Sequence, residues 1–230
     1  EKLNANPEAA KNRPKGIIAN PNCSTIIMNV PVWPLHKANP IKRIIVSTYQ
    51  AASGAGRPAM DELEATTRAW AEGKPIETKV FPYQLAMNLF CHNSSIEENG
   101  YNTEEMKMVN ETRKIFAAPD IQVTATCVRI PVMRAHCESI NLTFRDPMPE
   151  SRVVELLRDA SGVAILDDRE NNRSPQPVDA TGRDEVFVGR IRQDISQPDG
   201  RGIDLFVAGD QIRKGAALNA VQIAELVAAE

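Results

Sequence analysis

The spacing of hydrophobic and polar positions changes from segment to segment along this chain, and this spacing distinguishes the expected helices from the expected strands. Apolar residues at helical spacing, with Gly, Pro or acidic residues near the ends, indicate helices. The expected helices cover 23–38, 57–73, 102–116, 149–162 and 214–230. The first begins near Ser24 and contains Pro31 and Pro34, so we expect a kink or a division there.

Stretches that are rich in β-branched residues, or that alternate apolar and polar positions, indicate strands. The expected strands lie within 15–20, 41–53, 121–146, 163–168, 185–196 and 201–210. Segment 121–146 should form two strands around Pro131, and the last two strands should form a hairpin around 197–200. Residues 74–101 are expected to form a long ordered loop. This order of elements predicts an α+β fold, with a mixed, largely antiparallel sheet and helices packed on one face.

The composition is that of an ordinary globular protein, and it narrows the possible functions. Of the 230 residues, 42% are hydrophobic and 25% are charged, and the formal net charge is −3. This balance gives no electrostatic footprint for nucleic acid or an anionic membrane surface, and no apolar run approaches the ~20 residues that cross a bilayer. We therefore expect no nucleic-acid partner and no membrane.

The first residues are expected to precede the folded part. The chain starts with Glu rather than Met, shows no signal-peptide pattern, and has an opening rich in Asn, Pro and Ala, so we expect a linker at 1–14 and a longer parent protein. Its four cysteines are too sparse for a disulfide scaffold and lack zinc-type spacing. This indicates free thiols, no metal site and a reducing, cytoplasmic setting.

The stretch "ANPNCSTI" places one thiol where an extended segment meets an expected helix. If that helix starts at Ser24, Cys23 lies at its N-terminal end. Backbone N–H groups and the positive end of the helix dipole favour a thiolate there and could stabilise an oxyanion. Cysteine is also a common small buried residue. Position alone leaves a nucleophile and a packing residue equally open.

His136 is the second candidate, in a segment that also contains Arg129 and Arg134. Alternation along a strand puts Arg134 and His136 on one face, while Arg129 needs the bend at Pro131 to join them. A Cys with a distant His is a general signal for a nucleophile and its base. An isolated His is nevertheless more often a surface or core residue.

Two further groups are candidates on weaker grounds. Gln50 precedes "AASGAGR", in which Gly54 allows close approach of a ligand. The dinucleotide pattern G-x-G-x-x-G is absent from the whole chain. Glu104 and Lys107 are three residues apart on an expected helix and therefore face the same side. The alternative to a functional role is an ordinary exposed ion pair.

Five segments stand in an order and spacing that cover nearly the whole chain. They are "GIIANPNCSTI", "VSTYQAASGAGR", "NTEEMKMVNETRKI", "CVRIPVMRAHCESINL" and "GDQIRKGAALNAVQIAE". Cys23 and Gln50 are 27 residues apart, and Arg129 and His136 are seven apart. Together these segments resemble the aspartate-semialdehyde dehydrogenase family. The resemblance implies a fold like the catalytic domain of glyceraldehyde-3-phosphate-dehydrogenase-like enzymes.

The resemblance also implies reductive dephosphorylation of β-aspartyl phosphate to aspartate semialdehyde, with NADP(H), in lysine, threonine and methionine synthesis. Cys23 would form a thioester, His136 would act as acid and base, and Gln50 would orient the acyl group. The implied substrate ligands are Arg129 for the α-carboxylate, Glu104 for the amino group, and Lys107 and Asn22 for the phosphate. Ser53, Gly54 and Gln211 would lie against the cofactor. A homodimer is implied, in the cytoplasm or, in a plant, in the plastid.

The chain departs from the family in two ways. It lacks the Gly-rich nucleotide-binding half, and Gln211 stands where the family usually has Asn. The resemblance thus implies a catalytic and dimerisation domain at 15–212 and a C-terminal helix at 213–230 that would pack on the missing half. We expect the chain alone to be inactive. The alternatives are a cysteine acyltransferase or hydrolase, acting without nicotinamide, and a non-catalytic dimerisation module.

Overall fold

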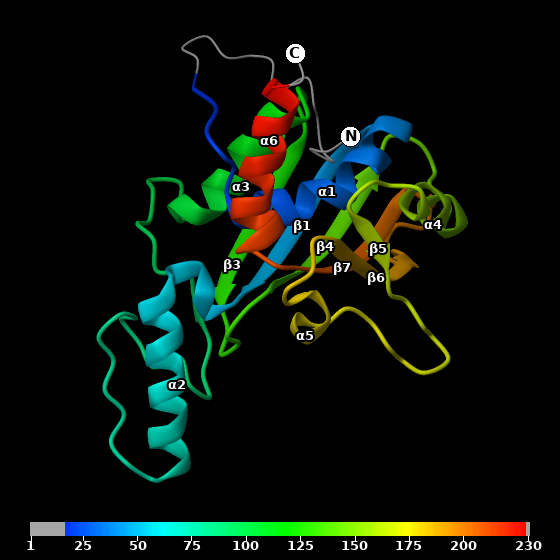
Figure 1. Cartoon of the computed structure of the whole chain (residues 1–230). Coiled ribbons are helices and arrows are strands. Elements are labelled where there is room, and N and C mark those ends of the chain that lie inside the picture. The colour runs from blue at the N-terminus through cyan, green and yellow to red at the C-terminus, as the bar shows by residue number, and fades with distance from the viewer. Residues whose placement is uncertain (1–16, 229–230) are drawn as a thin grey trace.

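A mixed sheet forms the centre of the computed structural model, which describes residues 17–228 (Figure 1). Within this range the strand order is β2-β3-β1-β4-β7-β6-β5. The strands are β1 (Ile41–Gln50), β2 (Phe90–Cys91), β3 (Gln122–Arg129), β4 (His136–Phe144), β5 (Val163–Ile165), β6 (Val186–Gln193) and β7 (Gly202–Gly209). β1 with β3 and β5 with β6 are parallel, and the other neighbours are antiparallel. The predicted α+β fold with a largely antiparallel sheet is confirmed.

The longer helices that pack on the sheet share one face of it. The helices are α1 (Cys23–Ala38), α2 (Arg57–Ala71), α3 (Thr103–Ile115), α4 (Glu150–Arg158), α5 (Pro177–Ala180) and α6 (Leu218–Ala228), with a 3-10 turn at Ala52–Ala55 and a π-helical turn at Arg213–Ala217. α1, α3 and α4 enclose the main core, whereas α2 projects beyond the edge of the sheet (Figure 1). The short α5 lies against the other face, beside Cys137 and Ala208.

α1 is one continuous helix despite its two prolines. Asn22 caps its N-terminus, and Ile27 and Leu35 are fully buried. The predicted division at Pro31 and Pro34 is wrong, since no break occurs at either residue. Each proline removes a backbone hydrogen bond from the helix. The free energy gained by burying the helix between the sheet and its neighbours offsets this loss.

Some element ends also differ from the prediction. The expected strand at 15–20 is wrong for its described part, because residues 17–20 pair with no strand and Ile17 is 78% exposed. The loop at 74–101 contains β2 and is otherwise irregular. The C-terminal helix starts as a π-helical turn and becomes α-helical at Leu218. The predicted linker at 1–14 lies outside the described residues.

The strand register arranges side chains in rows across the helix-covered face. At the end of the sheet, Gln50 of β1 pairs with Arg129 of β3, and His136 begins β4 one residue before Cys137, the partner of Tyr49. Side chains two residues apart along a strand share a face. The next two rows inward are Cys127, Thr48 and Glu138, and then Ala125, Val46 and Ile140. The end of the face is therefore polar, and the face becomes apolar toward the main core.

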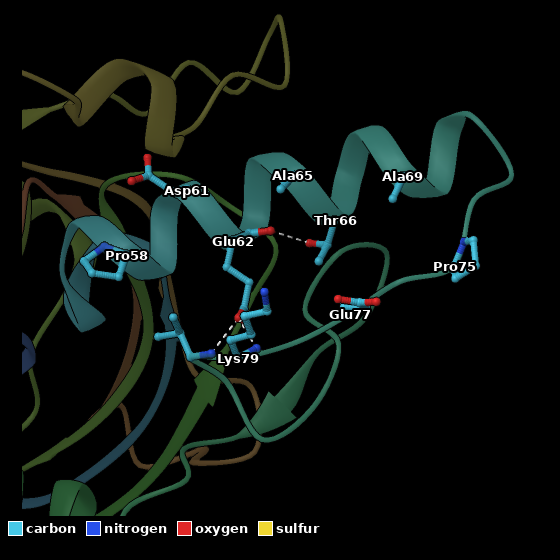
Figure 2. Close-up of a pocket in the computed structure, with 10 residues that line it drawn as sticks. Pro58, Asp61, Glu62, Ala65, Thr66, Ala69, Pro75, Glu77 and Lys79 are labelled. Atoms are coloured by element: carbon cyan, nitrogen blue, oxygen red, sulfur yellow. Dashed lines mark hydrogen bonds between the residues drawn. The ribbon is translucent and has the colours of Figure 1, made fainter.

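α2 and the loop after it form a smaller unit at 57–91, which we call the α2 unit. Its buried residues Ala59, Leu63, Phe81, Leu85 and Ala86 pack with Ala52 of the 3-10 turn. The carboxylate of Glu62 accepts hydrogen bonds from the backbone N–H groups of residues 79–81, which ties the loop to the helix. Figure 2 shows Glu62 pointing from the helix toward Lys79 of the loop. An open pocket of about 440 Å³ between α2 and this loop contains none of the predicted site residues.

Candidate active site

The N-terminus of α1 carries the predicted nucleophile. The side-chain oxygen of Asn22 accepts hydrogen bonds from the backbone N–H groups of Ser24 at 3.0 Å and Thr25 at 3.2 Å. Such a cap satisfies N–H groups that have no partner within a helix, and the helix accordingly begins at Cys23. The predicted helix start beside the thiol is confirmed.

Glu104 connects this helix start to α3 and β1. Its Oε1 accepts hydrogen bonds from the side-chain amides of Asn22 at 2.8 Å and Gln50 at 3.2 Å, and its Oε2 lies 3.2 Å from Nζ of Lys107. Gln50 also donates to Oγ of Ser24 at 2.7 Å. Burial alone would raise the pKa of Glu104, but the hydrogen bond from Asn22 and nearby positive charge hold that pKa below its usual value. Glu104 is therefore ionised at neutral pH.

His136 is buried, and its hydrogen bonding fixes the tautomer of the neutral ring. Nδ1 accepts a hydrogen bond from the backbone N–H of Ala51 at 3.0 Å, so the ring proton is on Nε2. Nε2 has no hydrogen-bond partner among the described residues. Burial, with a smaller contribution from the charge of Arg129, lowers the pKa of His136 to about 3. The resting residue is a neutral imidazole that presents an N–H group.

Arg129 is held by the same backbone turn. Its Nη1 donates to the carbonyl oxygen of Ala51 at 2.7 Å, while its Nε is buried without a partner in residues 17–228. A Cβ at Gly54 would lie 3.0 Å from Nη1 of Arg129 and 3.1 Å from Cε1 of His136. Any larger residue would therefore push against both side chains. The turn at 51–54 sets the positions of the guanidinium and the imidazole together.

Cys23 lies against the π-helical turn that precedes α6. A Cβ at Gly215 would be 3.0 Å from Cβ of Cys23 and 3.2 Å from Cβ of Gln211. Burial, followed by the charge of Glu104, raises the pKa of Cys23 to about 11. The backbone N–H of Ser24 lowers the pKa of Cys23, as expected at a helix N-terminus, but desolvation outweighs this contribution, and the resting residue is a thiol.

The three residues assigned to the cofactor lie together. Nε2 of Gln211 donates to Oγ of Ser53, and its Oε1 accepts from the backbone N–H of Ala135 at 2.9 Å. Gly54 follows Ser53 and is exposed. The polar side chains of this group therefore bind each other and the backbone, and Gly54 presents an open surface next to His136.

The structure thus places all ten predicted site residues at one end of the sheet. One group surrounds Glu104 and the start of α1, and the other surrounds the turn at 51–54. Arg134 belongs to neither group, because its Nη2 forms an ion pair with Asp210 at 2.7 Å, and Arg129 meets His136 beside Gly54. The chain reverses between β3 and β4, so alternation along a single strand does not apply across residues 130–135.

Sequence reasoning missed three contributors to the site. Ala51 acts only through its backbone, and Gly215 acts by having no side chain, so neither gives a side-chain signal. Glu111 accepts a hydrogen bond from the backbone N–H of Asn22 at 2.8 Å. It could have been found, because it lies seven residues after Glu104 on the same helix face. Residues 17–228 contain no cluster suited to a metal ion and no helix able to cross a membrane.

A family model and curated proteins match most of the chain. The semialdehyde dehydrogenase dimerisation domain matches residues 32–214. Aspartate-semialdehyde dehydrogenase of Synechocystis sp. is 60% identical over 222 residues, which are 96% of this chain and 65% of that protein. The Bacillus subtilis protein of the same name is 45% identical over 226 residues, with 95% and 65% covered. The chain spans about 65% of the length of these curated relatives.

Solved structures match the same part of the fold. Aspartate semialdehyde dehydrogenase II of Vibrio cholerae, complexed with ASA, has a TM-score of 0.94 and 44% identity, and the match covers 100% of this chain and 68% of that one. Aspartate semialdehyde dehydrogenase of Candida albicans, solved with NADP, has a TM-score of 0.71 and 24% identity, with 99% and 65% covered. The second match concerns the fold alone.

Proposed function

The chain belongs to the semialdehyde dehydrogenase family, and we propose that it contains the thioester-forming centre of an aspartate-semialdehyde dehydrogenase. The reaction is reductive dephosphorylation of β-aspartyl phosphate to aspartate semialdehyde. The observation that carries the proposal is a thiol at a capped helix start, at the same end of the sheet as Arg129, Gln50 and His136. This end of the sheet thus combines a nucleophile in Cys23, a hydrogen-bond donor in His136 and a guanidinium fork in Arg129.

The charged groups of the site complement those of β-aspartyl phosphate. Arg129 has a buried N–H at Nε without a partner, and its planar fork suits the α-carboxylate. The ionised Glu104 suits the ammonium group, and the exposed ammonium of Lys107 suits the phosphate. Asn22 has one amide hydrogen left for the phosphate, because its oxygen caps α1 and its other hydrogen binds Glu104.

In the first half of the proposed reaction, Cys23 attacks the acyl carbon, the bond from that carbon to the phosphate oxygen breaks, and a thioester forms. The thiol proton passes to the departing phosphate, because Nε2 of the resting His136 already carries a proton. Gln50 uses both amide hydrogens on Ser24 and Glu104, so it would orient the substrate through Oε1, which is buried without a partner in the described part of the chain.

In the second half, NADPH, when bound, supplies the hydride that reduces the thioester. His136 donates a hydrogen bond from its Nε2–H to the oxygen on which negative charge develops, and it keeps its proton. As this oxyanion collapses to the aldehyde, the carbon–sulfur bond breaks, and Cys23 leaves as a thiolate that takes up a proton from solvent. The hydrogen bond from the backbone N–H of Ala51 to Nδ1 supports this donor role, since it keeps the proton on Nε2, the ring nitrogen that is free.

The proposed cofactor residues suit a nicotinamide ring. Gly54 is exposed beside His136, so a flat ring could approach its backbone from the solvent side. Ser53 and Gln211, fixed by their mutual hydrogen bond, would border that ring. Because the chain contains no G-x-G-x-x-G segment, we expect the 230 residues alone neither to bind NADPH tightly nor to turn over.

The proposed partner is a second copy of the chain. Among the described helices, the short α5 packs on the sheet face opposite α1, and Tyr101 of the loop before α3 contacts Thr124 there. This face exposes parts of Ile45, Tyr49, Val128 and Phe206, a mixture of apolar side chains that a second copy could bury. The matched family model, a dimerisation domain, supports this proposal. A sedimentation-equilibrium mass of about two chains would agree with it, and a mass of one chain would contradict it.

The thioester step can be tested without any nicotinamide. We expect the protein, mixed with β-aspartyl phosphate, to release about one equivalent of phosphate and to gain an aspartyl adduct on the Cys23 peptide. Cys23→Ser should show neither change. Cys91→Ser is the matched control, since Cys91 is an exposed thiol on β2, and it should behave like the wild type.

The same measurement distinguishes the alternatives. Continuous phosphate release without nicotinamide would favour a cysteine hydrolase, in which water would hydrolyse the thioester on Cys23. Absence of both adduct and release in the wild type, with the fold intact, would contradict the proposal and favour a dimerisation module.

A further inference from the structure

The guanidinium of Arg129 has an aromatic neighbour that the proposed reaction does not use. Cζ of Arg129 lies 5.7 Å from the ring centroid of Phe81, within the range of a cation–π contact. Both side chains are buried, with 3% of Arg129 and 5% of Phe81 exposed. A cation–π contact is stronger where water is excluded, so this pair fixes the guanidinium more firmly than a surface pair would.

Phe81 is itself held from two sides by the α2 unit. Its backbone N–H donates to Glu62 at 3.0 Å, in the set of three hydrogen bonds that ties 79–81 to α2. Its ring packs edge-on against Phe90, with centroids 5.8 Å apart. Phe90 lies directly opposite Arg129 in the β2–β3 register. The aromatic ring therefore has a fixed place relative to the strand that carries the arginine.

We propose that Phe81, held by Glu62, is a positioning residue that orients Arg129 toward the α-carboxylate of the substrate. The carbonyl oxygen of Ala51 fixes one corner of the guanidinium, through Nη1, and the ring of Phe81 restricts its remaining movement. The buried N–H at Nε then stays available for a carboxylate. A planar fork binds a carboxylate well only when its orientation is set, so the α2 unit contributes to substrate selectivity from outside the binding pocket.

This inference rests on the proposed role of Arg129, and two small ligands test both. L-aspartate has the α-carboxylate, whereas β-alanine is the same molecule without it. Each ligand is titrated as a protectant of Cys23 against iodoacetamide at pH 8, with peptide mapping to separate Cys23 from the other thiols. The ratio of the two half-protecting concentrations measures recognition of the α-carboxylate. We expect L-aspartate to protect at least tenfold better than β-alanine.

The variants separate positioning from simple packing. Phe81→Leu should reduce the aspartate advantage at least fivefold and leave protection by β-alanine unchanged, while Phe81→Tyr, which keeps the ring face, should retain the advantage. Tyr83→Leu is the matched control, because Tyr83 packs on Phe90 at 5.5 Å in the same aromatic group but is 60% exposed and has no ring contact with Arg129. It should behave like the wild type.

The possible outcomes distinguish the two proposals. Equal protection by the two ligands in the wild type would contradict the proposed role of Arg129 and, with it, this inference. A wild type that discriminates, together with a Phe81→Leu variant that discriminates equally well, would overturn the positioning role of Phe81 alone. If Phe81→Leu does not fold, Glu62→Gln provides the same reading, since it loosens the 79–81 loop and leaves the ring intact; unchanged discrimination there would overturn the proposal.

Discussion

Two hydrophobic clusters support the site, and they differ in size and in what they hold. The main core, between the sheet and α1, α3 and α4, lies beneath Cys23, Gln50 and His136. The smaller cluster joins the α2 unit to the turn at 51–54 and lies beside Arg129. Reacting groups are thus anchored on the large cluster, and the proposed carboxylate ligand depends on the small one.

This difference bears on how binding and chemistry can be separated. A segment with few buried contacts opens locally at a lower free-energy cost than the main core of a domain. The α2 unit buries few side chains and borders an open pocket, so its opening should release Arg129 while Cys23 and His136 stay in place. We therefore expect changes in the α2 unit to weaken binding, and changes in the main core to unfold the protein.

The largest expected effect comes from a cavity in the main core. Ile27 is fully buried, so Ile27→Ala should lower the free energy of unfolding by about 2–5 kcal/mol, as measured by chemical denaturation. Hydrogen exchange should then accelerate throughout the sheet. Leu63→Ala, with Leu63 only 3% exposed in α2, is the comparison, and its faster exchange should be confined to 57–91. Equally global unfolding in Leu63→Ala would show that the two clusters form one cooperative unit.

A smaller effect, dependent on pH, is expected at Glu138 in the main core. It is fully buried, both carboxylate oxygens lack a partner in the described structure, and burial raises its pKa well above the usual value of 4.5. The folded protein therefore keeps this proton at pH values where the unfolded chain has lost it, so its contribution to stability falls as pH rises above about 4.5. Glu138→Gln should be more stable than the wild type at pH 8 and equally stable at pH 4.

Thermal denaturation across pH 4 to 8 measures this difference. Glu98→Gln, at an exposed position, is the control and should leave the pH dependence unchanged. A Glu138→Gln variant that is less stable than the wild type at pH 8 would show that the carboxylate is ionised and paired, which would contradict the buried, protonated assignment.

Local sequence signals predicted the parts of the fold that local interactions determine. The helix start near Ser24, the helix expected at 102–116 and the hairpin of β6 and β7 are confirmed. The strand expected near Ile17 is wrong, because an apolar run becomes a strand only when a neighbour pairs with it. The parallel pairing of β1 with β3 joins segments about 80 residues apart, and nothing within either segment specifies it.

The site shows the same limit. Residue types and the family resemblance together named the ten side chains, all of which lie at one end of the sheet; Asn22, Ser53 and Gln211 came from the resemblance alone. These signals did not predict the turn at Ala51, whose backbone N–H and carbonyl oxygen set the tautomer of His136 and the position of Arg129. Nor did they predict the high pKa of Cys23, because desolvation depends on packing by distant segments, including the turn that contains Gly215.

The smallest expected effect is at Glu62, in the α2 unit, and its pH dependence has the opposite sign to that of Glu138. Burial alone would raise the pKa of Glu62, but hydrogen bonds from the backbone N–H groups of 79–81 hold that pKa below 4.5. Its contribution to stability is present above about pH 4.5 and is lost as pH falls through the lower, folded value. Hydrogen exchange at 79–83, corrected for intrinsic rates, should accelerate on acidification in the wild type.

Glu62→Gln should exchange faster at 79–83 already at pH 7 and respond little to acid, because a neutral amide accepts these hydrogen bonds more weakly than a carboxylate. Glu64→Gln, which removes an exposed ion pair with Arg68 on the same helix, should retain the wild-type response. If the loosened loop also costs Glu62→Gln about twofold to fivefold of the L-aspartate advantage, the small cluster controls binding through Phe81. An unchanged L-aspartate advantage despite faster hydrogen exchange at 79–83 would mean that the turn at 51–54 alone holds Arg129. Substrate binding would then not depend on the small cluster.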